Sequence, residues 1–184
     1  TVNMEENTVS YHNNKAEPWK VTLIDTGINT LTGGRIKRVQ DYVNNETFML
    51  TYGDGVSDIN INELVTFHKK QSKTITMTSV QPEGRFGALH INANHKVEHF
   101  QEKPKGDGTW INGGFFVCEP KVFEYIEDGE SVVFERAPLE NLANDGEMVT
   151  YKHHGFWKPM DTLRDKNSLN EMWDSGTALW KTWE

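Results

Sequence analysis

The sequence reads Phe48-Met49-Leu50-Thr51-Tyr52-Gly53-Asp54-Gly55 in the second quarter of its length. The apolar part of this stretch predicts a short strand, and the glycines on either side of Asp54 stop it. Asn60 then offers an N-cap for a helix over residues 61–70, and a β-branched run over residues 74–80 predicts a second strand. A strand, a helix and a strand in this order favour a right-handed crossover and parallel pairing.

Similar patterns continue on both sides of this unit. Upstream, residues 21–24 predict a strand and a helix begins at residues 32–34. Downstream we expect a hairpin, a strand, a helix, a strand and a helix, at residues 88–100, 113–117, 132–144, 148–151 and 163–173. The whole predicts an α/β protein, with a mixed, mainly parallel sheet flanked by helices, as one domain over residues 1–184.

Composition narrows the class of protein. The chain has 184 residues and carries 19 Lys and Arg against 27 Asp and Glu, a formal charge of −8. We expect neither nucleic acid nor a membrane as a partner, because nucleic acid and anionic membranes attract clustered basic residues. The single cysteine, Cys118, lies in an apolar run, which predicts a buried free thiol and a cytoplasmic protein. The first residues form no signal peptide and lack an initiator Met, so we expect a fragment or a processed product.

Four of the segments that follow predicted strands contain residues that could bind a ligand. Ligands of open α/β sheets bind beyond such strand ends. Each also has a plainer interpretation. Asp54 between glycines also fits a simple turn, and Gly87 fits a β-bulge as well as a close approach to a ligand. The Glu-Lys-Pro-Lys run at residues 102–105 also fits a solvated loop, and Asp161 fits a helix N-cap. Trp157, beside Asp161, is the less ordinary feature of the fourth segment.

Taken in order, these motifs resemble those of the sugar-1-phosphate nucleotidylyltransferases. The set is Gly-Asp-Gly, Arg-Phe-Gly, Glu-Lys-Pro, Asn-Gly-Gly and Trp followed by Met-Asp-Thr, at residues 53–55, 85–87, 102–104, 112–114 and 157–162. In its detailed residue pattern the sequence is similar to glucose-1-phosphate cytidylyltransferases over residues 17–27, 32–35, 106–108, 111–117, 159–165 and 180–184. The resemblance covers essentially the whole chain and implies a Rossmann-like nucleotidyltransferase fold.

The resemblance implies transfer of a cytidylyl group from CTP to α-D-glucose 1-phosphate, which gives CDP-glucose and pyrophosphate. It implies Mg²⁺ as cofactor and a homo-oligomer. Asp54 and Asp161 would hold the metal and, with Lys103 on the sugar phosphate, form the catalytic set. The substrate-binding residues that it implies are Gly33, Gly34, Arg35 and Gly53 near the nucleotide, and Gly87, Glu102, Asn112 and Trp157 on the sugar side.

One departure from the family pattern is large. The family opens with a strand and a glycine-rich loop, Gly-Gly-x-Gly-Thr-Arg, followed by a Pro-Lys pair, and this sequence has neither. We therefore expect this polypeptide alone to bind CTP poorly and to turn over negligibly.

Three alternatives remain at this stage. A related enzyme could use a different nucleotide or sugar, and a sugar-nucleotide-binding module on the same fold could lack catalysis. A glycosyltransferase is disfavoured, because residues 53–55 contain no Asp-x-Asp pair.

Overall fold

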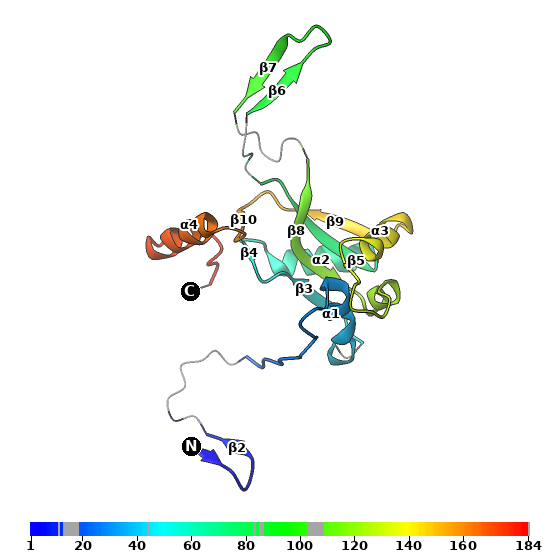
Figure 1. Ribbon diagram of the computed structural model, residues 1–184, viewed down its shortest axis with the longest axis vertical. Coiled ribbons are helices and arrows are strands. Elements are labelled where there is room, and N and C mark those ends of the chain that lie inside the picture. Colours follow the sequence, from blue (N-terminus) through cyan, green and yellow to red (C-terminus); the bar gives the residue numbers. More distant parts are fainter. Residues whose placement is uncertain are drawn as a thin grey trace.

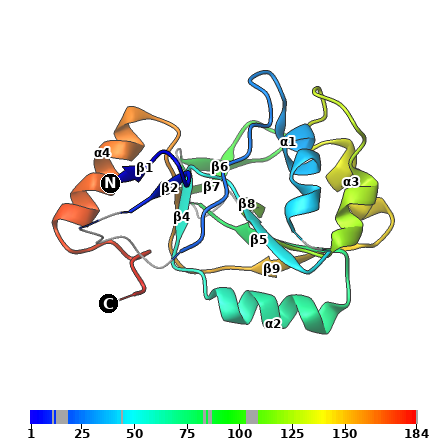
Figure 2. The same ribbon diagram turned by 90° about the horizontal axis from the view of Figure 1, so that it is seen from below.

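The computed structural model describes residues 1–10, 12, 19–43, 45–82, 84, 87–102 and 109–183. Its body is a four-stranded sheet in the order β3-β8-β5-β9. Helix α2 covers one face of this sheet, and α1 and α3 lie on the other face (Figure 2). The α/β class with a flanked sheet is therefore confirmed.

The four strands are β3 (Phe48–Thr51), β5 (Ile75–Val80), β8 (Ile111–Cys118) and β9 (Met148–Lys152). Strand β8 runs antiparallel to both β3 and β5, whereas β9 runs parallel to β5. The sheet is mixed, as predicted, but only the β5–β9 pair is parallel. Strands β3 and β5 share a direction, as the crossover requires, yet they do not pair because β8 lies between them.

The helices are α1 (Thr32–Arg38), α2 (Ile61–Gln71), α3 (Ala137–Asn144) and α4 (Leu163–Asp174). Two 3-10 turns, η1 (Gln40–Tyr42) and η3 (Pro120–Tyr125), follow α1 and β8 respectively. Helix α2 begins as predicted, because the Asn60 side chain accepts a 3.2 Å hydrogen bond from the amide of Glu63. None of the described helices combines the length and the apolar character that crossing a membrane requires.

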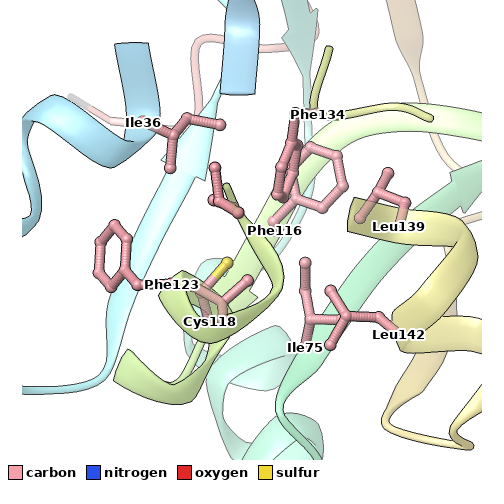
Figure 3. Close-up of a cluster of buried hydrophobic side chains, with 10 residues drawn as sticks. Ile36, Ile75, Phe116, Cys118, Phe123, Phe134, Leu139 and Leu142 are labelled. Carbon is pink, nitrogen blue, oxygen red and sulfur yellow. The ribbon is translucent and has the colours of Figure 1, made fainter. Parts of the chain in front are cut away.

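The hydrophobic core fills the space between the sheet and the α1–α3 side (Figure 3). Its buried members are Ile36, Ile75, Phe116, Cys118, Val122, Phe123, Ile126, Phe134, Leu139 and Leu142. Phe116 of β8 meets Phe134 edge to face, with ring centroids 5.8 Å apart. Cys118 is fully buried, so the predicted free thiol is confirmed.

Three small ladders lie outside this sheet. The hairpin of β6 (Ala88–Ile91) and β7 (Val97–Gln101) was predicted and stands away from the body, whereas β1 (Val2–Asn3) and β2 (Thr8–Val9) lie at the opposite end (Figure 1). The third ladder pairs β4 (Gly55–Ser57) with β10 (Trp157–Pro159) in antiparallel fashion.

The strand predicted at residues 21–24 is wrong, because residues 19–31 contain no strand. Val21 and Leu23 are 69% and 91% exposed. A β-branched run becomes a strand only where a neighbour completes its hydrogen bonds, and in the described part of the chain no strand pairs with this one.

Candidate active site

The β4–β10 ladder brings together the backbone segments of two aspartates from opposite halves of the chain. Pro159 of β10 pairs with Gly55 of β4. At the next step the amide of Met160 donates a 2.7 Å hydrogen bond to the carbonyl oxygen of Asp54. Asp161 is thereby placed next to the Gly53–Asp54 segment. Both carboxylates are exposed, and neither side chain forms a hydrogen bond or ion pair with any described residue.

Asp161 does not cap the helix that follows it. The N-cap of α4 is Thr162, whose hydroxyl accepts a 3.2 Å hydrogen bond from the amide of Asp165. The Asp165 carboxylate in turn accepts from the amide and the hydroxyl of Thr162, at 3.0 and 2.7 Å. This capping box satisfies the start of the helix and leaves the Asp161 carboxylate available for another purpose.

A small hollow of about 40 Å³ opens beside Asp54. Its lining residues come from the ends of β3 and β4, from β8 and from β10: Thr51, Tyr52, Asp54, Gly55, Asn112, Gly113, Gly114, Phe115, Trp157 and Pro159. Three predicted site residues, Asp54, Asn112 and Trp157, therefore meet here. Ligand pockets usually measure about 300–1,000 Å³, so the described residues form one wall of a site rather than a closed pocket.

Two glycines of β8 allow Trp157 and Tyr52 to pack closely against this wall. The indole Nε1 of Trp157 donates a 2.7 Å hydrogen bond to the carbonyl of Gly113, which ties β10 to β8. Gly114 has φ +77°, and a Cβ there would lie 2.9 Å from the ring of Tyr52. The amide of Gly114 donates to Asn112 Oδ1 at 2.8 Å, so the backbone itself orients the Asn112 amide group.

Tyr52, which the sequence did not single out, is the most connected side chain of the hollow. Its hydroxyl donates a 2.5 Å hydrogen bond to Glu135 Oε1 and lies 3.5 Å from Asn112 Nδ2. Burial, followed by the hydrogen bond to Glu135 and its charge, raises the pKa of Tyr52 well above its ordinary value. The hydroxyl therefore stays protonated and continues to donate. Only its place beside Gly53-Asp54-Gly55 could have indicated its role.

A partly buried pair, His153 and Asp58, supports the far end of the same ladder. His153 Nε2 lies 2.8 Å from Asp58 Oδ1 and 3.2 Å from the carbonyl oxygen of Phe156. Asp58 follows β4 and His153 follows β9, while the amide of Asp58 also donates to the Phe156 carbonyl at 3.2 Å. This pair fixes the chain just before β10, and no sequence motif indicated it.

Gly33 and Gly34, which were predicted near the nucleotide, are buried at the start of α1. A Cβ at Gly33 would lie 2.7 Å from the side chain of Val132, and one at Gly34 would collide with the carbonyl oxygen of Gly129. Both glycines are thus required by close packing against the segment before Phe134. Neither lines the hollow that contains Asp54.

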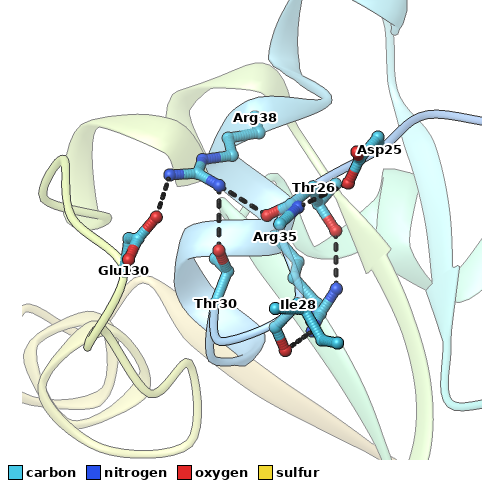
Figure 4. A network of polar contacts seen from close by, with 8 residues as sticks. Asp25, Thr26, Ile28, Thr30, Arg35, Arg38 and Glu130 are labelled. Carbon is cyan, nitrogen blue, oxygen red and sulfur yellow. Dashed lines mark hydrogen bonds and ion pairs between the residues drawn. The ribbon is translucent and has the colours of Figure 1, made fainter.

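Arg35 and Arg38 organise the loop before α1 (Figure 4). Arg35 donates to the Thr26 hydroxyl at 2.7 Å and to the carbonyl of Ile28 at 3.2 Å. Arg38 donates to the Thr30 hydroxyl at 2.8 Å and forms a 3.1 Å ion pair with Glu130. The guanidinium of Arg35 is exposed but already bonded to its own loop.

Of the other predicted residues that the structure describes, Gly53, Gly87 and Glu102 do not line the hollow. Gly87 and Glu102 face each other at the base of the β6–β7 hairpin, where a Cβ on Gly87 would lie 2.5 Å from the Phe100 ring and 3.0 Å from Glu102 Oε2. Gly53 has no atom within 4 Å of its would-be Cβ, so it borders open space. Lys103 lies outside the described residues.

Asp54 and Asp161 are the two carboxylates that were predicted to hold a metal ion. Among the described residues, no group of three or more His, Cys, Asp and Glu side chains is placed to hold a metal ion. Asp54 and Asp161 provide carboxylate oxygens only, the ligand type of hard divalent cations that complete their shell with water and phosphate oxygens.

Comparison with known proteins finds one family and several relatives. The nucleotidyl transferase family matches residues 6–170. Glucose-1-phosphate cytidylyltransferase of Salmonella typhimurium is 52% identical over the full chain, which covers 71% of that relative. Mannose-1-phosphate guanylyltransferase of Mycobacterium tuberculosis is 30% identical over 73% of this chain and 39% of its own length. The crystal structure of HddC from Yersinia pseudotuberculosis has the same fold, with a TM-score of 0.58 at 19% identity over 78% of this chain and 62% of its own.

Proposed function

This chain belongs to the nucleotidyl transferase family, and we propose that it transfers the cytidylyl group of CTP to α-D-glucose 1-phosphate, giving CDP-glucose and pyrophosphate. The observation that supports the proposal is the β4–β10 pairing, which makes the backbone at Asp54 and Met160 neighbours, with Asp54 beside the hollow that Asn112 and Trp157 line. The 52% identity to a glucose-1-phosphate cytidylyltransferase supports the choice of nucleotide and sugar.

In this reaction a phosphate oxygen of glucose 1-phosphate attacks the α-phosphorus of CTP. A new P–O bond forms as the bond to pyrophosphate breaks, and pyrophosphate leaves with its electron pair. Negative charge spreads over phosphoryl oxygens, so catalysis consists of positioning and electrostatic stabilisation. No covalent link to the protein is needed.

We assign the cation site to Asp54 and Asp161. Their exposed and unpaired carboxylates fit Mg²⁺, which is bound in proteins through one or two carboxylates together with substrate phosphates. When bound, Mg²⁺ would neutralise charge on the phosphate oxygens. The two aspartates would orient the nucleotide phosphates through it.

The sugar side is assigned to Asn112 and Trp157. The Asn112 amide, held by the Gly114 backbone, would offer hydrogen bonds to sugar hydroxyls. Trp157, fixed by its bond to Gly113, would present an apolar surface to the sugar ring. Glu102 and Lys103 would contribute to hydroxyl and phosphate binding, with Gly87 beside them. Gly33, Gly34, Arg35 and Gly53 remain the proposed residues near the nucleotide.

The test is calorimetric titration of the protein with CDP-glucose in the presence and absence of Mg²⁺, alongside an assay for pyrophosphate release from CTP and glucose 1-phosphate. We expect Mg²⁺-dependent binding of CDP-glucose that is lost in Asp161→Ala. Pyrophosphate release by this polypeptide should be slight, because its sequence lacks the glycine-rich loop, and should be seen with CTP but not with UTP or dTTP. Equal release with UTP would reject the nucleotide assignment, and CDP-glucose binding that does not depend on Mg²⁺ would favour a sugar-nucleotide-binding module.

We also propose a cytoplasmic homo-oligomer. Apolar side chains after and within α4 are largely exposed, with Trp173 at 51%, Leu179 at 58% and Trp183 at 58%. Exposed aromatic surface of this kind marks contacts between subunits. Light scattering of the purified protein tests it, and a monomer at micromolar concentration would reject it.

A further inference from the structure

Glu135 joins two parts of the molecule through both of its carboxylate oxygens. Its Oε1 accepts the 2.5 Å hydrogen bond from the hydroxyl of Tyr52. Its Oε2 accepts a 2.7 Å hydrogen bond from the hydroxyl of Thr32, the first residue of α1. The same Thr32 hydroxyl accepts from the amide of Phe134 at 2.9 Å, so its orientation is fixed from two sides.

The chain of contacts continues from Tyr52 into the hollow. Asn112 Nδ2 lies 3.5 Å from the Tyr52 hydroxyl, and Asn112 Oδ1 accepts the 2.8 Å bond from the amide of Gly114. The Tyr52 amide in turn donates to the Gly114 carbonyl at 3.2 Å. A continuous polar path therefore leads from the start of α1, through Glu135 and Tyr52, to an amide group that lines the wall beside Asp54.

The carboxylate charge of Glu135 strengthens the two hydrogen bonds at the centre of this path. Hydrogen bonds to an ionised carboxylate are shorter and about twice as strong as neutral ones. Both oxygens of Glu135 are used in this way, although the residue itself is exposed. The raised pKa of Tyr52 keeps its proton on the hydroxyl, so the direction of this bond does not reverse at neutral pH.

We propose that Glu135 is a positioning residue that couples the Thr32–Arg35 segment to the Asn112 amide. The inference rests on the proposed function, in which the first segment lies near the nucleotide and the second binds the sugar. Through this path, a ligand that fixes the Thr32–Arg35 segment also stabilises the orientation of the Asn112 amide, and the reverse holds as well. Glu135 itself touches neither substrate.

The test has a first part that needs no ligand. Amide hydrogen exchange of Gly114 is measured in the wild type, Glu135→Ala, Thr32→Val and Thr32→Ser. We expect exchange at Gly114 to quicken about tenfold in Glu135→Ala and Thr32→Val, because a lost bond to a charged group loosens the Asn112 amide. Thr32→Ser keeps the hydroxyl and should retain the wild-type rate, while exchange at Val117 in the core of β8 should stay unchanged in all variants. Unchanged exchange at Gly114 in Glu135→Ala and Thr32→Val would overturn the inference.

The second part measures affinity for CDP-glucose by calorimetry with Mg²⁺. Tyr52→Phe and Thr32→Val should each weaken binding about three- to tenfold, and the double variant should bind no more weakly than Tyr52→Phe alone. Fully additive losses, or no loss in either single variant, would overturn the coupling. Absence of binding by the wild type would instead reject the proposed function, and the exchange rates of Gly114 would still decide whether the path exists.

Discussion

The main-chain amide of Met160 donates a 2.7 Å hydrogen bond to the carbonyl oxygen of Asp54, one step beyond the last residue pair of the β4–β10 ladder. This bond fixes the spacing of Asp54 and Asp161 through the backbone rather than through their side chains. It makes the backbone at Asp54 and at Met160–Asp161 neighbours, and within the described residues neither carboxylate has an ion-pair partner. Such unpaired negative charge is costly without a cation and useful with one.

The first prediction concerns these carboxylates. Asp54→Asn and Asp161→Asn preserve shape and remove one charge each, so each should abolish the Mg²⁺ dependence of CDP-glucose binding. Both residues are exposed, so the free energy of unfolding should change by less than about 0.5 kcal/mol. Asp174→Asn, at the exposed end of α4, is the matched control and should leave both quantities unchanged. Wild-type Mg²⁺ dependence in either site variant would contradict the assignment.

The second prediction concerns the left-handed backbone of β8. Gly114→Ala should destabilise the protein by about 2–4 kcal/mol, because a side chain at φ +77° is strained and its Cβ would meet the Tyr52 ring at 2.9 Å. Gly53→Ala, where a Cβ meets nothing within 4 Å, should change stability by less than about 1 kcal/mol. Urea unfolding followed by circular dichroism measures both. Equal stabilities of the two variants would contradict the structure of this segment.

The third prediction concerns pH. Burial, and then the charge of Glu119, raises the pKa of the Cys118 thiol above its ordinary value of 9.0. The thiol therefore ionises more readily in the unfolded chain than in the folded one. Its contribution to stability is complete below pH 9 and falls by about 1.4 kcal/mol per pH unit above it.

Cys118→Ala removes this contribution. Under reducing conditions, the difference in unfolding free energy between the wild type and this variant should be constant from pH 7 to 8.5 and should shrink between pH 9 and 10.5. Contributions from tyrosines and lysines cancel in the difference. A difference that stays constant up to pH 10.5 would show that the thiol is not shielded as the structure indicates.

The fourth prediction concerns the Asp58–His153 pair. His153→Ala should cost about 1–3 kcal/mol of stability, since it leaves the buried Oδ1 of Asp58 without its 2.8 Å neighbour. It should also weaken CDP-glucose binding, because the pair fixes the chain entering β10. His99→Ala, on the exposed hairpin, should alter neither by a measurable amount. Thermal unfolding and calorimetry of the two variants provide the comparison.

Elements with local signals could be predicted from the sequence. The N-cap at Asn60 and the turn at residues 92–95 act over a few residues, and both are confirmed. Pairing between distant strands has no such signal. Nothing in residues 48–80 indicates that β8 would separate β3 from β5, and β4 and β10 are three-residue strands too short for a periodic pattern.

The candidate site likewise contains some residues that the sequence could predict and others that it could not. Asp54, Asn112 and Trp157 were expected together from the order of their motifs, and the structure gathers them around one hollow. Glu135 gave no signal, because an acidic residue before a helix is ordinary and its partners lie 83 and 103 residues away. The choice between cap and ligand for Asp161 depended on which neighbour bonds the helix start, a question of geometry that composition could not decide.

The central place of β8 has a consequence for how the chain folds during synthesis. Its two neighbours, β3 and β5, are made first, and each must wait for β8 to emerge from the ribosome before its hydrogen bonds are completed. Until then the unpaired edges of β3 and β5 are open to pairing with other chains. Protection of this interval, by a chaperone or by slow translation before residue 111, should therefore raise the yield of folded protein.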